Sequence, residues 1–319
     1  MERETMTGES SMERETYELI VNREEQGIRL DAFLAQRLPE YSRSFLQKNI
    51  KDHYVTVDEK VSKASYKVSE GEKVSFEVPA LKEPEIKPEN IPLDILYEDE
   101  DVIVINKPKQ MVVHPAPGHY NGTMVNALMY HCKNSLSGIN GVMRPGIVHR
   151  IDQDTTGVIV ACKNDHAHQC IAEQLKVHSI TRKYRAIVLG HLKEDGTVVG
   201  KIGRHPIDRK KMAINEKNGK EAVTHYHVID ELNHQYTYVE CQLETGRTHQ
   251  IRVHMASIGH PILGDSIYGA QKCPFHLMGQ TLHAAVLGFV HPTTKEYMEF
   301  EAPLPDYFEK LLKHLRRQV

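Results

Sequence analysis

The sequence predicts an α+β fold, in which a domain built on a mixed, largely antiparallel sheet follows a smaller domain. Apolar segments typical of strands outnumber helical segments, and the helical ones lie at irregular intervals rather than in a regular strand–helix alternation. Residues 79–92 are rich in proline and charge, as linkers are. The 319 residues also exceed what one hydrophobic core usually serves. We therefore expect a disordered segment at 1–16, a first domain at 17–78, a linker at 79–92 and a second domain at 93–319.

The first domain is predicted to contain two amphipathic helices and then two short strands. The apolar residues of the first helix lie at helical spacing, and we expect Asp31 and Arg37 on its opposite, exposed face. These apolar residues are Leu30, Phe33, Leu34 and Leu38. Ser42 caps the second helix. Its inward side chains are Phe45, Leu46 and Ile50, and its outward ones are Arg43, Ser44, Gln47, Lys48 and Lys51. Strands are expected at 54–57 and 73–78.

The second domain is predicted to be mainly strands with occasional helices. Residues 95–97 and 102–105 flank an acidic turn and predict a hairpin. Helices are expected at 123–132 and 165–177, the second with Asp165 as its N-cap. The other predicted strands lie at 147–150, 158–162, 184–189, 224–229, 236–243 and 250–254.

Composition excludes several classes of protein. The apolar stretches are far shorter than the roughly 20 residues that span a bilayer, and residues 1–15 lack the apolar core of a secretion signal. The five cysteines are scattered without a CxxC pair, so we expect reduced thiols in the cytosol rather than disulfides or structural zinc. A net charge of −3 does not indicate a nucleic-acid partner. The basic runs 182–185, 204–211 and 313–317 could bind one, although each run alone is better interpreted as a solvated face.

The densest candidate for a catalytic segment is residues 146–158. An apolar strand ends there in a polar loop that contains Asp152 and Asp154, and Gly157 permits a tight return into the next strand. The same pattern is equally consistent with a solvated hairpin, so spacing alone leaves both interpretations open.

Two further polar segments are candidates. From His249 onward, residue alternation would place Gln250, Arg252 and His254 on one face of a strand. The basic segment 181–186 contains Tyr184, whose phenol could act as an acid, a base or a stacking surface.

These segments resemble those of a known family. The loop HRIDQDTTGVIV, the strand KYRAIVLG and the segment ETGRTHQIRVHMASIGHPILGD resemble the three catalytic motifs of the RluA family of pseudouridine synthases. RLDAFLAQRLPEYSRSFLQKNI resembles the S4 RNA-binding domain that precedes the catalytic domain in RluD-like members. The resemblance covers nearly everything from about residue 20 to 305. It implies a catalytic domain of the pseudouridine synthase type, isomerisation of uridines in structured RNA, and no metal or organic cofactor.

The resemblance also implies roles for single residues. Asp152 matches the aspartate that attacks the target uridine, so that the glycosidic bond is broken and remade at carbon 5. Tyr184 matches the tyrosine that packs on the base and is implicated in removing the carbon 5 proton. Arg252 matches the basic residue that forms a salt bridge with the aspartate and would orient it. His149 and Arg150 would help evert the uridine and fill its place. The other expected RNA contacts of these motifs are Thr156, Arg247, His249 and Gln250.

The S4-like stretch implies an RNA-binding face on the second helix. Its residues are Arg43, Ser44, Gln47, Lys48 and Lys51, which could otherwise be only the wet face of a small domain. Family members usually have Gly after this helix and Asn-Gly in the next turn, where this chain has His53 and Asp58-Glu59. Because the RluD-like branch includes enzymes acting on large-subunit ribosomal RNA, we expect that RNA or a ribosome assembly precursor as partner, with no membrane, and a monomer.

Three alternatives were weighed against this interpretation. The histidines form no HExxH or paired Cys/His pattern, so surface, core or RNA-contacting roles are favoured over a metal site. A non-catalytic RNA-binding protein would not need the trio Asp152, Tyr184 and Arg252. A small-molecule hydrolase is disfavoured because a GxSxG elbow and a phosphate loop are both missing.

Overall fold

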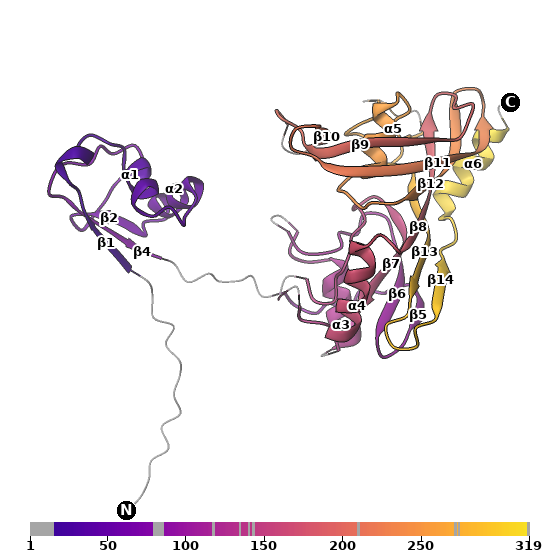
Figure 1. Cartoon of the computed structure of the whole chain (residues 1–319), viewed down its shortest axis with the longest axis horizontal. Coiled ribbons are helices and arrows are strands. Elements are labelled where there is room, and N and C mark those ends of the chain that lie inside the picture. Colours follow the sequence, from indigo (N-terminus) through magenta and orange to yellow (C-terminus); the bar gives the residue numbers. More distant parts are fainter. Residues whose placement is uncertain are drawn as a thin grey trace, which may run out of the picture. The chain divides into compact units, whose positions relative to one another are not determined.

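The chain forms two compact units, one within residues 1–83 and one within 84–319 (Figure 1). The computed structural model describes residues 16–78, 86–116, 119–133, 135–139, 141, 144–208, 211–270, 273 and 275–317. The predicted disordered segment lies outside the described residues, except for Thr16, which begins the first strand. Residues 79–85 of the predicted linker lie outside them too. Within the described ranges, no helix is long and apolar enough to cross a membrane.

The first unit is a four-stranded antiparallel sheet packed against two helices. Its elements are β1 (Thr16–Ile20), α1 (Leu30–Arg37), α2 (Arg43–Lys51), β2 (Val55–Val57), β3 (Lys60–Val61) and β4 (Lys73–Glu77), with a short 3-10 turn at Arg23–Glu25. The strand order is β1-β4-β2-β3. Phe33, Leu46 and Phe76 fill a core shared by both helices and the sheet. Both predicted helices are confirmed, and Ser42 Oγ accepts the N–H of Phe45 at 3.3 Å as the expected cap.

The two turns that depart from the S4 pattern keep a left-handed backbone without glycine. His53 after α2 has φ 66°, and Asp58 and Glu59 between β2 and β3 have φ 45° and 65°. Such angles are costly for residues with a Cβ. Asp58 offsets part of the cost, because its carboxylate accepts the N–H of Lys73 at 2.9 Å.

Asp31 is buried, contrary to the prediction that it lies on the exposed face of α1. Its side chain is fully covered and forms ion pairs with Arg29 and Arg43, each at 3.0 Å. Gln47 Nε2 also donates to it at 2.6 Å. Burial acts to raise the pKa of Asp31, but the hydrogen bonds from Arg29, Gln47 and Arg43 outweigh it and hold the pKa well below its usual range. Helical periodicity places polar residues in water, whereas a fully paired carboxylate can be buried.

The second unit is built on one ten-stranded sheet. Its order is β10-β9-β11-β12-β8-β13-β7-β6-β5, with β14 paired to β13. Every strand pair is antiparallel except β13 with β7, which confirms the mixed, largely antiparallel sheet. The strands are β5 (Ile95–Glu98), β6 (Val102–Lys107), β7 (Thr156–Cys162), β8 (Thr181–Leu189), β9 (Gly196–Arg204), β10 (Met212–Ile214), β11 (Lys220–Leu232), β12 (Tyr236–Leu243), β13 (Leu282–Val290) and β14 (Tyr297–Glu301). The helices are α3 (Met124–Cys132), α4 (Asp165–Lys176), α5 (Gln250–Ser257) and α6 (Asp306–Arg316).

Both faces of the central strands are buried. In β6, Ile103 and Ile105 belong to one core and Val102 and Val104 to another on the opposite face. Double burial explains why β6 and β7 are continuous apolar runs rather than alternating ones. α4 packs against β7 and β13, and α5 against β9, β10 and β11, so the middle of the sheet is a rigid base for the loops at its edge.

Two predicted strands are wrong. Residues 147–150 form no strand, since Ile147 makes only an isolated bridge to Ala161. Residues 250–254 belong to the helix α5, in which all residues from Gln250 to Met255 are buried. The spacing of polar residues distinguishes a helix from a strand only when one face is exposed to solvent. This short segment is buried on every side, so its polar spacing does not indicate its secondary structure.

Two local predictions in the same region are also corrected. α4 begins at Asp165, but its N-cap is Asn164, whose side chain accepts the N–H of Ala167 at 2.8 Å. Asp165 instead accepts the hydroxyl of Ser137 at 2.7 Å. Gly157 lies inside β7 rather than in a turn, with φ 108°, and a Cβ there would clash with the neighbouring strand β13.

Candidate active site

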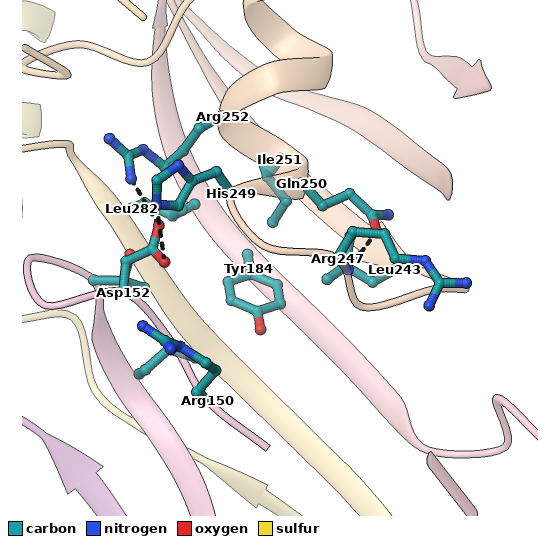
Figure 2. Close-up of a pocket in the computed structure, with 12 residues that line it drawn as sticks. Arg150, Asp152, Tyr184, Leu243, Arg247, His249, Gln250, Ile251, Arg252 and Leu282 are labelled. Atoms are coloured by element: carbon teal, nitrogen blue, oxygen red, sulfur yellow. Dashed lines mark hydrogen bonds and ion pairs between the residues drawn. The ribbon is translucent and has the colours of Figure 1, made fainter. Parts of the chain in front are cut away.

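Three segments that are distant in sequence meet at the centre of the sheet. Asp152 lies in the loop before β7, Tyr184 lies on β8, and Arg252 lies in the first turn of α5. β13 runs between β7 and β8 and so fixes their separation. Arg252 Nη1 donates to Asp152 Oδ2 at 2.8 Å, as Figure 2 shows. The predicted trio therefore lines one pocket.

Arg252 is held by a second carboxylate that the sequence interpretation did not single out. Asp265 accepts from Arg252 Nε at 2.6 Å and from Nη2 at 2.9 Å, and its side chain is fully buried. It also accepts the backbone N–H groups of Ile267 and Tyr268. Asp265 thus occupies one edge of the guanidinium and leaves Nη1 for Asp152. A signal was present, since Asp265 ends the quoted segment GHPILGD.

The pKa shifts agree with a fixed ion-pair chain. Burial acts to raise the pKa of Asp265, but the hydrogen bonds and charge of Arg252 prevail and lower it. Burial acts to lower the pKa of Arg252, and its bonds to Asp265 and charge contacts with Asp265 and Asp152 raise it instead. Both groups therefore remain charged at neutral pH.

His249 approaches the other carboxylate oxygen of Asp152. Its Nε2 lies 3.7 Å from Asp152 Oδ1, and its Nδ1 lies 2.8 Å from the hydroxyl of Tyr268. That hydroxyl already accepts the N–H of Met212, so it can donate to Nδ1 and leave the ring proton on Nε2, facing Asp152. Burial lowers the pKa of His249, which favours this neutral form.

Tyr184 forms the floor of the pocket. Figure 2 shows its ring between Asp152 and Arg150 on one side and Arg247 on the other. Leu243, Ile251 and Leu282 supply apolar walls. Burial raises the pKa of Tyr184, so the phenol is neutral. A flat neutral ring with apolar walls suits stacking of a nucleobase.

Lys107 is a second residue that the motifs did not indicate. It ends β6, is fully buried, and its Nζ donates to the carbonyls of Pro108, Met111 and Gln153 at 2.7, 2.9 and 3.0 Å. Gln153 follows Asp152, so Lys107 braces the loop that carries the candidate nucleophile. Burial lowers the pKa of Lys107 to about 7, whereas three acceptors need the three N–H donors of the ammonium form. A lone lysine at the end of an apolar strand was the only sequence signal.

The structure separates the other predicted contacts. Arg150 and Arg247 line the pocket. Gln250 lines it too, but its amide is committed to the fold: it accepts from Thr245 Oγ1 at 2.8 Å and donates to the carbonyl of Val223 at 2.9 Å. Thr156 is not brought to the pocket, because its buried hydroxyl is bonded to His283 at 2.8 Å.

His149 has a contact that fixes its protonation. Its Nε2 accepts the backbone N–H of Val160 at 3.1 Å. Burial, with a contribution from Arg182, lowers the pKa of His149 to about 3. His149 is therefore a neutral acceptor that ties the loop to β7.

The remaining predicted contacts lie on the first unit. The outward residues of α2 are exposed as predicted: Arg43, Ser44, Gln47, Lys48 and Lys51. Arg43 and Gln47 are held by their bonds to Asp31. Lys48 and Lys51 have exposed side chains at the C-terminal end of α2. As to metals, the described part of the chain has no group of three or more His, Cys, Asp or Glu that could hold an ion.

A carboxylate held by an arginine beside a buried tyrosine ring, in a chain that also has a basic helix face, fits the class of RNA-modifying enzymes. The family described as RNA pseudouridylate synthase matches residues 101–257, and the S4 domain matches residues 28–74. The chain belongs to the RNA pseudouridine synthases and is one of the members that carry an S4 domain.

Individual relatives agree over most of the chain. The uncharacterised RNA pseudouridine synthase YlyB of Bacillus subtilis (strain 168) is 50% identical over 94% of this chain and 98% of its own length. The ribosomal large subunit pseudouridine synthase D of Zymomonas mobilis is 44% identical over 94% of this chain and 98% of its own length. The solved structure of human RNA Pseudouridylate Synthase Domain Containing 1 superimposes with a TM-score of 0.55 at 25% identity, covering 70% of this chain and 95% of that one.

Proposed function

We propose that this enzyme converts uridines of large-subunit ribosomal RNA to pseudouridine. The relatives from Zymomonas mobilis and Escherichia coli (strain K12), each named ribosomal large subunit pseudouridine synthase D, support this choice of RNA. The S4 domain supports a structured substrate, because it adds a second RNA-binding surface to the chain.

Asp152 is the proposed nucleophile. Its carboxylate oxygen forms an ester bond to C1′ as the bond from C1′ to uracil N1 breaks. The freed uracil turns, and C5 then bonds to C1′ as the ester bond to Asp152 breaks. A proton leaves C5 and a proton joins N1, so the product is an isomer and the reaction needs no co-substrate. The observation that carries this proposal is the bond from Arg252 Nη1 to Asp152 Oδ2 at 2.8 Å, which presents an oriented carboxylate to the pocket.

Tyr184 is proposed to stack on the base and then to receive the C5 proton. Because burial raises the pKa of Tyr184, its phenol is neutral, so it takes the C5 proton only as it passes its own proton through water to N1 of the uracil. Arg150, exposed at the pocket mouth, is proposed to occupy the space that the everted uridine leaves in the RNA.

The test uses Asp152→Ala and the matched control Asp154→Ala, which removes a carboxylate two residues away in the same loop. Each protein is incubated with unmodified large-subunit ribosomal RNA and, separately, with unmodified transfer RNA, and pseudouridines are mapped by adduct formation and primer extension. We expect new stops with the wild type and with Asp154→Ala, and none with Asp152→Ala. Stops that persist with Asp152→Ala would refute the nucleophile, and stops found only on transfer RNA would refute the ribosomal substrate.

A further inference from the structure

The catalytic pocket adjoins a second, wider cavity. The pocket beside Asp152 has a volume of about 60 Å³, and the neighbouring cavity has about 340 Å³. They share six lining residues, among them Tyr184 and Arg247, so a ligand whose base lies on Tyr184 extends into the second cavity. Asp152 is among the shared residues and is the one carboxylate in the described lining of the second cavity. The residues that belong to the second cavity alone include His149, His178 and Arg182, and no carboxylate.

Arg182 is a buried cation without a counter-ion. Arg182 is 7% exposed, and its side chain lies on the same face of β8 as that of Tyr184, two positions away. Its Nη2 donates to the carbonyl of Glu244 at 3.0 Å, but its Nε has no hydrogen-bond partner among the described residues. No carboxylate within the described ranges forms an ion pair with it. By contrast, Arg185 on the other face of β8 is paired with Glu240.

The neighbours of Arg182 increase its deficit of negative charge. Burial lowers the pKa of Arg182, Tyr184 acts to raise it, and the charge of Arg247 lowers it further. His149 is neutral and cannot offset the charge. A cation held out of water beside a like charge is unfavourable in the free protein, and an anion in the cavity would remove that penalty.

The loop after β12 lies close against the guanidinium at Gly246. A Cβ at this position would be 2.5 Å from Arg182 Nη1, so the absence of a side chain allows the loop after β12 to close over the arginine. The backbone at Glu244 holds the same group from the other edge. The guanidinium is therefore preorganised in the cavity wall rather than free in solvent.

We propose that the cavity around Arg182 binds a backbone phosphate next to the target uridine. This inference rests on the proposed placement of the uridine base on Tyr184. A nucleotide bound there carries phosphates on both sides of its ribose, within reach of the adjoining cavity. A planar guanidinium, assisted by Arg247, matches the charge and the geometry of a phosphate. The phosphate supplies the negative charge that the chain itself does not provide, and its position fixes the register of the strand.

The test is a cycle that changes the arginine and the phosphate separately. Synthetic RNAs carry a neutral methylphosphonate immediately 5′ or immediately 3′ of a uridine that the enzyme modifies, and kcat/KM is measured for wild type and Arg182→Gln. For one of the two positions, we expect the methylphosphonate to lower the wild-type value about 10- to 100-fold. The same change should lower the value of Arg182→Gln less than about twofold, because the contact is already absent.

Arg185→Gln is the matched control, since it removes an arginine from the opposite face of the same strand. It should respond to the methylphosphonates as the wild type does. The proposal is refuted if both methylphosphonates reduce wild type and Arg182→Gln by equal factors, or if neither reduces the wild type. The substrate is whichever RNA the mapping experiment identifies, so a wrong ribosomal assignment does not decide this test.

A stability measurement excludes a merely structural role. Arg182→Gln removes an uncompensated buried charge, so its melting temperature without RNA should equal or exceed that of the wild type. A clear decrease, together with equal losses in the cycle, would identify Arg182 as a structural residue.

Discussion

Replacing Asp265 by Asn should test whether this residue positions Arg252 and stabilises the fold without taking part in the reaction itself. Asp265 makes two charge-assisted hydrogen bonds with Arg252, each worth about 1.5–3 kcal/mol. Asn keeps the shape of the side chain, but its amide NH₂ replaces a carboxylate oxygen and would face the N–H donors of Arg252. Because Arg252 keeps Asp152 as a second partner, we expect a loss of about 3 kcal/mol in the free energy of unfolding, the lower end for a broken buried ion pair. We also expect kcat to fall about 100-fold, because an unanchored Arg252 misplaces Asp152.

Urea denaturation and release of tritium from 5-tritiated uridine in RNA measure the two effects. Asp152→Asn is the matched variant, since it removes the other carboxylate on the same guanidinium. It should abolish tritium release yet change the unfolding free energy by less than about 1 kcal/mol, because the buried pair with Asp265 remains. An Asp265→Asn enzyme with wild-type stability and wild-type kcat would show that Arg252 does not depend on Asp265.

Three further predictions follow from single contacts. Tyr184→Phe keeps the stacking ring and should lower kcat at least about 100-fold with little change in KM, measured by tritium release; an unchanged kcat would exclude the phenol as proton acceptor. Gly157→Ala should destabilise the protein by about 3 kcal/mol or more in urea, because the added Cβ meets the backbone of β13 at a φ that only glycine adopts readily; a loss below about 1 kcal/mol would contradict the strand spacing. The neutral His149 contributes stability that is fully present above the unfolded pKa of 6.5 and is lost as pH falls towards about 3. Between pH 7 and 5, wild type should therefore lose about 1–2 kcal/mol more than His149→Gln, and equal losses would mean that His149 is solvated.

The sequence predicts best those elements whose pattern records one physical requirement. β12 was predicted with its observed bounds, because buried apolar residues alternate with the more exposed Glu240 and Gln242 in its second half. α2 was predicted through its cap at Ser42 and its basic outer face. The trio of Asp152, Tyr184 and Arg252 was available only through the resemblance, since no local spacing relates residues on three distant segments.

What the sequence could not predict depends on tertiary pairing. Helical periodicity placed Asp31 in solvent, and no pattern singled out Asp265. Both side chains are buried because arginines from other elements form ion pairs with them. α5 was predicted as a strand because its polar and apolar residues do alternate. Since the segment is buried on all sides, that alternation does not indicate which residues face solvent and so does not distinguish a strand from a helix. The Arg182 cavity is invisible in sequence, because a missing counter-ion leaves no pattern.

The strand order affects how the chain folds during its synthesis. β13 is made after β8, yet it lies between β7 and β8 in the sheet. Asp152 and Arg252 are 100 residues apart, so at about 5–20 residues per second translation brings out the second partner roughly 5–20 s after the first. Until Leu282–Val290 follows, the halves of the sheet that bear Asp152 and Tyr184 have no common neighbour. We therefore expect a growing chain to fold its S4 domain early and to complete its catalytic centre only when this late strand inserts, so that a chain terminated before β13 would bind RNA without isomerase activity.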